Sequence, residues 1–162
     1  MEPINPSALQ SLLAAQPVAA LATLHKGEPA VSMTPYALLP QGRGVVIHVS
    51  RLATHTADML AHPGVGLMVT GTPDMADTPL ALPRLSVQGE AQPCAPGEAD
   101  YDEARALYLA RFPDSEMMFG FADFALFIVR IAHARFVGGF GRAHALTPEQ
   151  LARALEAAPP AR

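Results

Sequence analysis

The sequence predicts a mainly β, α+β protein: an antiparallel barrel of about six strands with helices at its margins. Runs of strand-forming residues fill the middle of the chain and are joined mostly by short turns rich in Gly and Pro. Such turns favour antiparallel neighbours, because parallel strands need a longer crossover. The 162 residues, half of them hydrophobic, suffice for one domain with its own core. We expect a single domain over residues 1–162, with a frayed tail at 155–162.

Two helices are expected to flank the strands. Asn5 precedes Pro6 as a capping residue, and leucines then recur at helical spacing, which predicts a helix over residues 6–16. Near the other end, Thr147 is followed by Pro148 and, three residues after the threonine, by Gln150. This pattern is typical of a capping box and predicts a second short helix.

The first strands form a predicted hairpin, with runs at 18–24 and 30–39 joined by a turn at 25–27. In the second run, apolar residues alternate with residues that can hydrogen-bond, so the two faces differ. The apolar positions are Val31, Met33 and Pro35, and the alternate positions are Ser32, Thr34 and Tyr36. Pro35 limits ladder pairing because it has no N–H group.

The remaining chain supplies four more predicted strands and two more helices. The strands lie at 45–50, 65–70, 85–92 and 124–137. A short helix is expected at about 54–62, where Pro63 and Gly64 end it. The stretch 98–111 places apolar residues at helical spacing and predicts an amphipathic helix between the last two strands.

Composition excludes several classes of function. The net charge is −4 and no run of basic residues is present, so we expect neither a nucleic-acid partner nor a membrane surface as partner. The longest apolar stretch, 124–131, is far shorter than the roughly 20 residues of a membrane span. The N-terminus lacks a secretory pattern, and the single Cys94 agrees with a reducing compartment, so we expect a cytoplasmic protein.

The most informative segment runs from Ile47 to Thr56, where an apolar strand leads into hydroxyls, an arginine and a helix start. Hydroxyl and backbone N–H groups at a helix N-terminus favour a phosphate, and a guanidinium adds paired, charge-assisted hydrogen bonds. Ser50, Arg51 and Thr56 are the candidates. The alternative is ordinary helix capping beside a surface arginine.

Two further segments are candidates for a ligand site. Arg84, Ser86 and Gln88 share one face of a predicted strand, which could line a polar site or be an ordinary wet face. Gly89 after them could mark a bulge. The run 138–141 contains three glycines and Phe140, so a planar ring could approach its backbone closely. The alternative there is a flexible reverse turn.

Metal-binding and hydrolytic motifs are missing from the sequence. His48, His55 and His62 recur every seventh residue, but this spacing crosses from a strand into a helix. With no HExxH motif and no cysteine pair, we predict no metal site. His144 beside the glycine run is the remaining soft-ligand candidate, unless it is a solvated turn residue. No G-x-S-x-G motif or paired acids indicate a hydrolase.

Four segments taken in order, 27–36, 49–56, 83–89 and 136–143, resemble the FMN-binding split-barrel superfamily of pyridoxamine 5'-phosphate oxidase-like proteins. The likeness is closest to the haem-utilisation branch, whose members have an S-R-L-A-x-H-T segment and a V-G-G-F-G turn. The resemblance implies a six-stranded antiparallel split β-barrel with peripheral helices. It also implies a homodimer with two FMN molecules in clefts shared between the subunits.

The resemblance also implies the site residues. The phosphate would meet Ser50, Arg51, Thr56 and Arg84, and the strand from Ser32 would lie beside the flavin ring. No catalytic side chain is identified. The predicted cofactor-binding set is Ser32, Met33, Thr34, Pro35, Ser50, Arg51, Leu52, His55, Thr56, Arg84, Ser86, Gly139 and Phe140.

The function expected from this resemblance is an FMN-dependent oxidoreductase acting on a small-molecule redox substrate, with the redox chemistry supplied by the flavin. The chain has no tryptophan and no R-x-x-L-L-K strand, so we do not expect pyridoxamine phosphate oxidase activity itself. Three alternatives stay open: a haem-binding or haem-utilisation protein, a non-catalytic flavin carrier or sensor, and an empty barrel that serves as a dimeric interaction protein.

Overall fold

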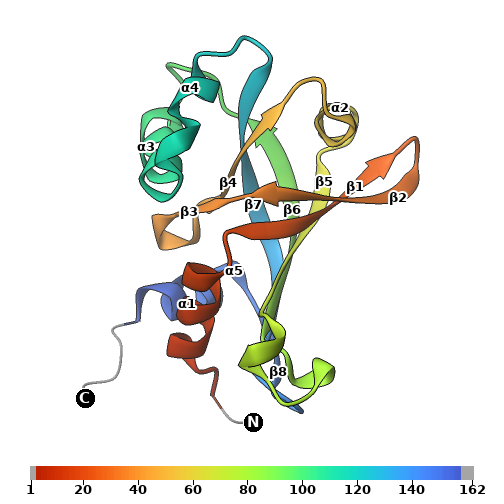
Figure 1. Ribbon diagram of the computed structural model, residues 1–162, viewed down its shortest axis with the longest axis vertical. Coiled ribbons are helices and arrows are strands. Elements are labelled where there is room, and N and C mark those ends of the chain that lie inside the picture. The colour runs from red at the N-terminus through yellow and green to blue at the C-terminus, as the bar shows by residue number, and fades with distance from the viewer. Residues whose placement is uncertain (1–2, 158–162) are drawn as a thin grey trace.

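The structure, a computed structural model, describes residues 3–157 and has an α+β fold with eight strands in one antiparallel sheet (Figure 1). The order is β2-β1-β5-β6-β7-β4-β3, and β8 pairs with β7. The strands are β1 (Val18–His25), β2 (Glu28–Pro35), β3 (Ala37–Leu39), β4 (Gly44–Ser50), β5 (Gly64–Thr70), β6 (Arg84–Pro93), β7 (Phe124–Val137) and β8 (Ala143–Leu146).

The sheet is not closed, and this corrects the prediction of a closed six-stranded barrel. The two ends of the strand order, β2 and β3, are consecutive in sequence and were predicted as one strand at 30–39. They separate at Tyr36, whose N–H donates to the Pro17 carbonyl, directly after Pro35, which has no N–H. The second additional strand, β8, forms after the glycine run. The sheet therefore curls until its edges approach, without a ladder between them.

Five α-helices and four short 3-10 turns surround the sheet in the described part of the chain. They are α1 (Pro6–Ala15), α2 (Thr54–Ala61), α3 (Tyr101–Arg111), α4 (Glu116–Phe119), α5 (Pro148–Glu156), and η1 (Pro40–Gly42), η2 (Pro73–Met75), η3 (Pro79–Ala81) and η4 (Pro113–Ser115). Both predicted caps are confirmed: Ala8 N–H donates to Asn5 Oδ1, and Thr147 and Gln150 form a capping box. Helix α5 includes residues 155 and 156, so the predicted tail begins too early; residues 158–162 lie outside the described residues.

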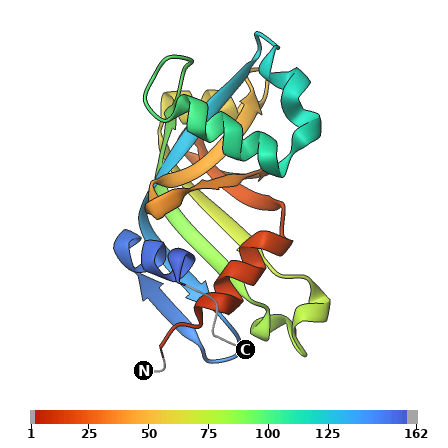
Figure 2. The same cartoon turned by 90° about the vertical axis from the view of Figure 1, so that its left-hand side faces the viewer.

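Two hydrophobic clusters lie on opposite sides of the sheet. The larger one fills the curl and includes Leu21, Ile47 and Phe136. Helices α1 and α5 lie below it and contribute leucines to it (Figure 2). The smaller cluster lies under α3, whose Ala104 and Tyr108 cover β4 and β7. No helix within residues 3–157 is long and apolar enough to cross a membrane.

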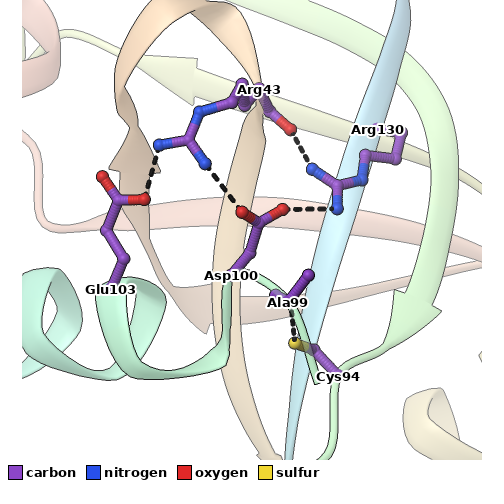
Figure 3. Close-up of polar contacts among 6 residues, drawn as sticks. All are labelled: Arg43, Cys94, Ala99, Asp100, Glu103 and Arg130. Atoms are coloured by element: carbon purple, nitrogen blue, oxygen red, sulfur yellow. Dashed lines mark hydrogen bonds and ion pairs between the residues drawn. The ribbon is translucent and has the colours of Figure 1, made fainter. Parts of the chain in front are cut away.

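An ion-pair network attaches α3 to the sheet (Figure 3). Asp100, in a left-handed conformation before α3, accepts from Arg43 at 2.8 Å and from Arg130 at 3.0 Å. Arg43 also reaches Glu103 at 2.6 Å. Cys94 is buried nearby, with Sγ 3.5 Å from the Ala99 carbonyl oxygen. The network joins the insertion between β6 and β7 to the start of β4.

Alternate residues of β6 face outward from the sheet. Leu85 and Val87 are buried, so Arg84, Ser86 and Gln88 face outward as predicted. The predicted irregularity at Gly89 is confirmed as a register shift, and a Cβ there would overlap the Arg130 carbonyl oxygen. This close approach requires glycine.

Candidate functional site

The segment that joins β4 to α2 is held by its own hydroxyl groups. Ser50 Oγ accepts from Leu52 N–H at 3.1 Å, and the Thr56 hydroxyl donates to the Ser50 carbonyl oxygen at 2.6 Å. Thr56 is fully buried, whereas the Arg51 and Leu52 side chains are exposed. Arg51 N–H also donates to the Asp123 carbonyl oxygen at 2.5 Å. The turn is therefore fixed by hydrogen bonds, with Arg51 presented to solvent.

Strand β2 meets this segment, as the predicted site requires. Ser32 Oγ lies 2.9 Å from His55 Nδ1, and burial lowers the pKa of His55. Thr34 is buried, whereas Met33 is 59% exposed. The structure therefore brings Ser32 of β2 together with His55 of the β4–α2 segment, whereas Met33 lies on the opposite, exposed face of β2.

Asp58, which the sequence analysis did not identify, anchors α2 beneath this group. Its buried carboxylate accepts from the Thr23 hydroxyl at 3.0 Å and lies 2.7 Å from His25 Nδ1. The hydrogen bond with His25 holds the pKa of Asp58 below its usual value. Its only signal in the sequence is an acid inside an apolar helix segment, and its partners lie more than 30 residues away in β1.

The remaining predicted residues, Arg84, Ser86, Gly139 and Phe140, meet in a separate pocket of about 330 Å³. The glycine run is the turn between β7 and β8, where Gly138 N–H donates to the Arg142 carbonyl oxygen. Gly141 has a φ of 73°, a conformation that favours glycine. The turn projects Phe140 outward with 75% of its surface exposed.

Arginines dominate this pocket. Arg135 and Arg142 line it together with Arg84, and the lining contains no acidic residue. The Arg84 guanidinium donates to the carbonyl oxygens of Leu80 and Leu82. Within the described residues 3–157, the Arg135 side chain forms no hydrogen bond or ion pair. We call this group, Arg84, Arg135 and Arg142 beside Phe140 and Leu80, the arginine pocket. Sequence reasoning missed Arg135, because only the pairing of β6 with β7 places it beside Arg84 and Ser86.

The two groups lie at opposite ends of the sheet. Ser50 pairs with Phe124 at the start of β7, and Arg84 pairs with Val137 at its end. β7 has 14 residues, or about 45 Å of strand at roughly 3.3 Å per residue. One copy of the chain therefore does not bring Arg51 and Arg84 to the same phosphate.

Comparison with known proteins identifies the family. The family model described as pyridoxamine 5'-phosphate oxidase matches residues 6–138. The chain belongs to the pyridoxamine 5'-phosphate oxidase family. A curated relative is the chloroplastic non-canonical heme oxygenase HOZ of Arabidopsis thaliana, 31% identical over 119 residues. The match covers 74% of this chain and 35% of HOZ, so the chain spans about a third of that relative's length.

Similar solved structures confirm the split-barrel fold and the resemblance to haem-utilisation proteins. A heme binding protein from Mycobacterium smegmatis is 27% identical, with a TM-score of 0.80, over 94% of this chain and 61% of that one. ChuZ of Campylobacter jejuni is 22% identical, with a TM-score of 0.78, over 92% and 63%. The heme storage protein HutZ of Vibrio cholerae is 22% identical, with a TM-score of 0.66, over 77% and 88%.

Proposed function

We propose that this member of the family binds haem, and that the arginine pocket holds the haem carboxylates. The observation that carries this proposal is the concentration of three guanidinium groups, with no acid in the lining, beside two exposed apolar side chains. Phe140 is 75% exposed and Leu80 is 69% exposed. A ligand that is both anionic and broadly apolar matches this combination.

The chemistry of the pocket suits a porphyrin with two propionates. Guanidinium groups bind carboxylates through paired, charge-assisted hydrogen bonds, which are among the stronger polar contacts in proteins. The edge of the ring that carries the propionates can pack on Phe140 and Leu80. Because the whole chain carries a net charge of −4, an anion is attracted here by the local arginines and not by the overall charge. The Mycobacterium smegmatis protein and HOZ support haem over other ligands of this charge and shape.

We further propose that the protein acts as a homodimer through the outward face of β1, β2 and β5. Val31, Met33 and Met68 are 76%, 59% and 42% exposed there, and Ala20 pairs with both methionines across the ladder. Contiguous exposed apolar surface of this kind marks an interface. A second copy that covers it would place the Arg51 end of one chain against the other chain, so that two copies share a cleft.

FMN is the second candidate, supported by the β4–α2 segment. Exposed Arg51 lies just before the N-terminus of α2, where the helix dipole favours a phosphate. Flavin would supply redox chemistry, and Ser32 to Pro35 would lie beside the ring. In that case the protein is an oxidoreductase for a small-molecule substrate, or a flavin carrier without turnover.

Separate absorption titrations of the purified protein with haemin and with FMN test the two candidates. We expect haemin to saturate with a shifted Soret band, and Arg135→Ala to weaken its binding about tenfold or more, because a charge-assisted hydrogen bond contributes roughly 1.5–3 kcal/mol. Arg153→Ala, an exposed arginine on α5, is the matched control. Equal haemin affinity in both variants would remove the arginine pocket from the site, and saturation by FMN alone would favour the second candidate.

A further inference from the structure

Four of the chain's six histidines have a neighbour that fixes the imidazole ring, three through a hydrogen bond and one through stacking. The pairs are His25 with Asp58, His55 with Ser32, His62 with the Gly64 amide, and His48 with Phe119. The remaining two, His133 and His144, form no hydrogen bond or ring contact with other residues in the range 3–157. These two rings are therefore available for another ligand.

The register of β7 and β8 separates these two histidines. His133 pairs with Gln88 and precedes Arg135 by two residues, so it lies on the outward face with the arginine pocket. Two residues of strand correspond to about 7 Å. His144 instead pairs with Phe136, which is buried in the core, and it belongs to the opposite face. Of the two, His133 alone shares the surface of the arginines.

The surface around His133 leaves room for a large ring. Arg135 pairs with Ser86 on one side and with Ala145 on the other, so the two positions directly opposite it carry small side chains, and Gln88 lies opposite His133. His133 itself is exposed, and it borders a hollow of about 430 Å³ that extends along residues 145–150, with Glu149 in its lining. The hollow and the arginine pocket are thus lined by neighbouring residues of β7 and β8.

We propose that His133 is the axial ligand of the iron when haem occupies the arginine pocket. This inference rests on the proposed haem binding. A neutral imidazole is a common protein ligand for haem iron, and Arg135 of the arginine pocket lies two residues along the same strand. The pairing of an imidazole with guanidinium groups distinguishes haem from FMN, since FMN has an anionic group but no metal for the imidazole to bind.

The test separates ligation of the iron from binding of the porphyrin. The full chain and the variants His133→Ala, His133→Gln and His144→Ala are titrated with ferric haem and with metal-free protoporphyrin IX, which has the carboxylates but no iron. We expect both His133 variants to bind protoporphyrin within about twofold of the unmodified protein. In resonance Raman spectra of their ferrous haem complexes we expect the iron–histidine stretching band to be lost. His144→Ala should retain the band, and free imidazole should restore nitrogen ligation to His133→Ala.

Two results would overturn the inference in distinguishable ways. An iron–histidine band that survives in both His133 variants would refute His133 as the ligand while leaving haem binding intact. Failure of the unmodified protein to bind either porphyrin would refute the proposed function and the ligand together. Circular dichroism of each variant verifies the fold, which exposed His133 is not expected to disturb.

Discussion

Acidification is expected to destabilise the protein through His48, a histidine buried beneath the α3–α4 insertion. Its ring stacks on Phe119 with a centroid separation of 3.8 Å and is only 7% exposed. Within residues 3–157, Nδ1 has no hydrogen-bond partner. Burial, together with the positive charge of Arg105, lowers the pKa of His48 to about 4. The folded protein therefore keeps this ring neutral under conditions where the unfolded chain would protonate it.

The sign and size of the effect follow from linkage. Above the unfolded pKa of about 6.5 neither state binds the proton, so stability is unaffected there. As the pH falls from 6.5 towards 4, only the unfolded state gains the proton and the free energy of unfolding decreases. With a folded pKa of about 4, the loss is about 1.4 kcal/mol at pH 5.5 and about 3 kcal/mol at pH 4.

Urea unfolding of the unmodified protein and of His48→Phe, at pH 7, 5.5 and 4, measures this loss. Phenylalanine keeps a ring against Phe119 but cannot titrate, and every other titrating group is common to both proteins. We expect the difference in unfolding free energy between the two to grow in favour of His48→Phe by about 3 kcal/mol from pH 7 to pH 4. A difference that is independent of pH would refute the assignment of a neutral, buried His48.

Three other perturbations test the fold and the interface. Gly89→Ala is expected to lower the free energy of unfolding in chemical denaturation by about 3 kcal/mol, because its Cβ would overlap the Arg130 carbonyl oxygen. The control is Gly66→Ala, whose Cβ would have its nearest atom at an ordinary 3.5 Å and should cost under about 1 kcal/mol. Asp100→Asn keeps a residue that tolerates the left-handed conformation but weakens the ion pairs with Arg43 and Arg130. Thermal unfolding should show a loss of stability of about 1 kcal/mol, and this loss should become smaller at high salt. Val31→Glu, on the exposed apolar face, should convert the expected dimer to a monomer in sedimentation velocity, and an unchanged dimer would place the interface elsewhere.

Local patterns in the sequence predicted the elements whose causes are local. The caps at Asn5 and Thr147 depend on side chains within three residues, and both are present in the structure. The break at Tyr36 depends on its N–H donating to Pro17, a residue 19 positions earlier, and no periodicity encodes that bond. For the same reason one strand was predicted where the chain forms β2 and β3 at opposite ends of the sheet.

The same distinction between local and long-range causes applies to the candidate site. Alternation within β6 placed Arg84 and Ser86 on one face correctly, because alternation belongs to a single strand. Arg135 joins them only through the pairing of β6 with β7, and Arg142 only through the turn into β8. Asp58 was missed because its two partners lie in β1, and its only local signal is an acid inside an apolar helix segment.

Because Arg51 and Arg84 lie far apart within one chain, whether they bind the same ligand depends on the oligomeric state. If two copies pair through the apolar face, a two-fold axis relates them. Each contact between different regions of the two chains then occurs twice in the dimer. If the ligand spans Arg51 of one copy and the arginine pocket of the other, Val31→Glu should lose haemin binding together with dimerisation. If the arginine pocket is sufficient, the Val31→Glu monomer should bind haemin with unchanged affinity while Arg51→Ala has no effect. Haemin titration of these two variants alongside Arg135→Ala therefore decides whether the two ends of the sheet serve one cleft or two separate sites.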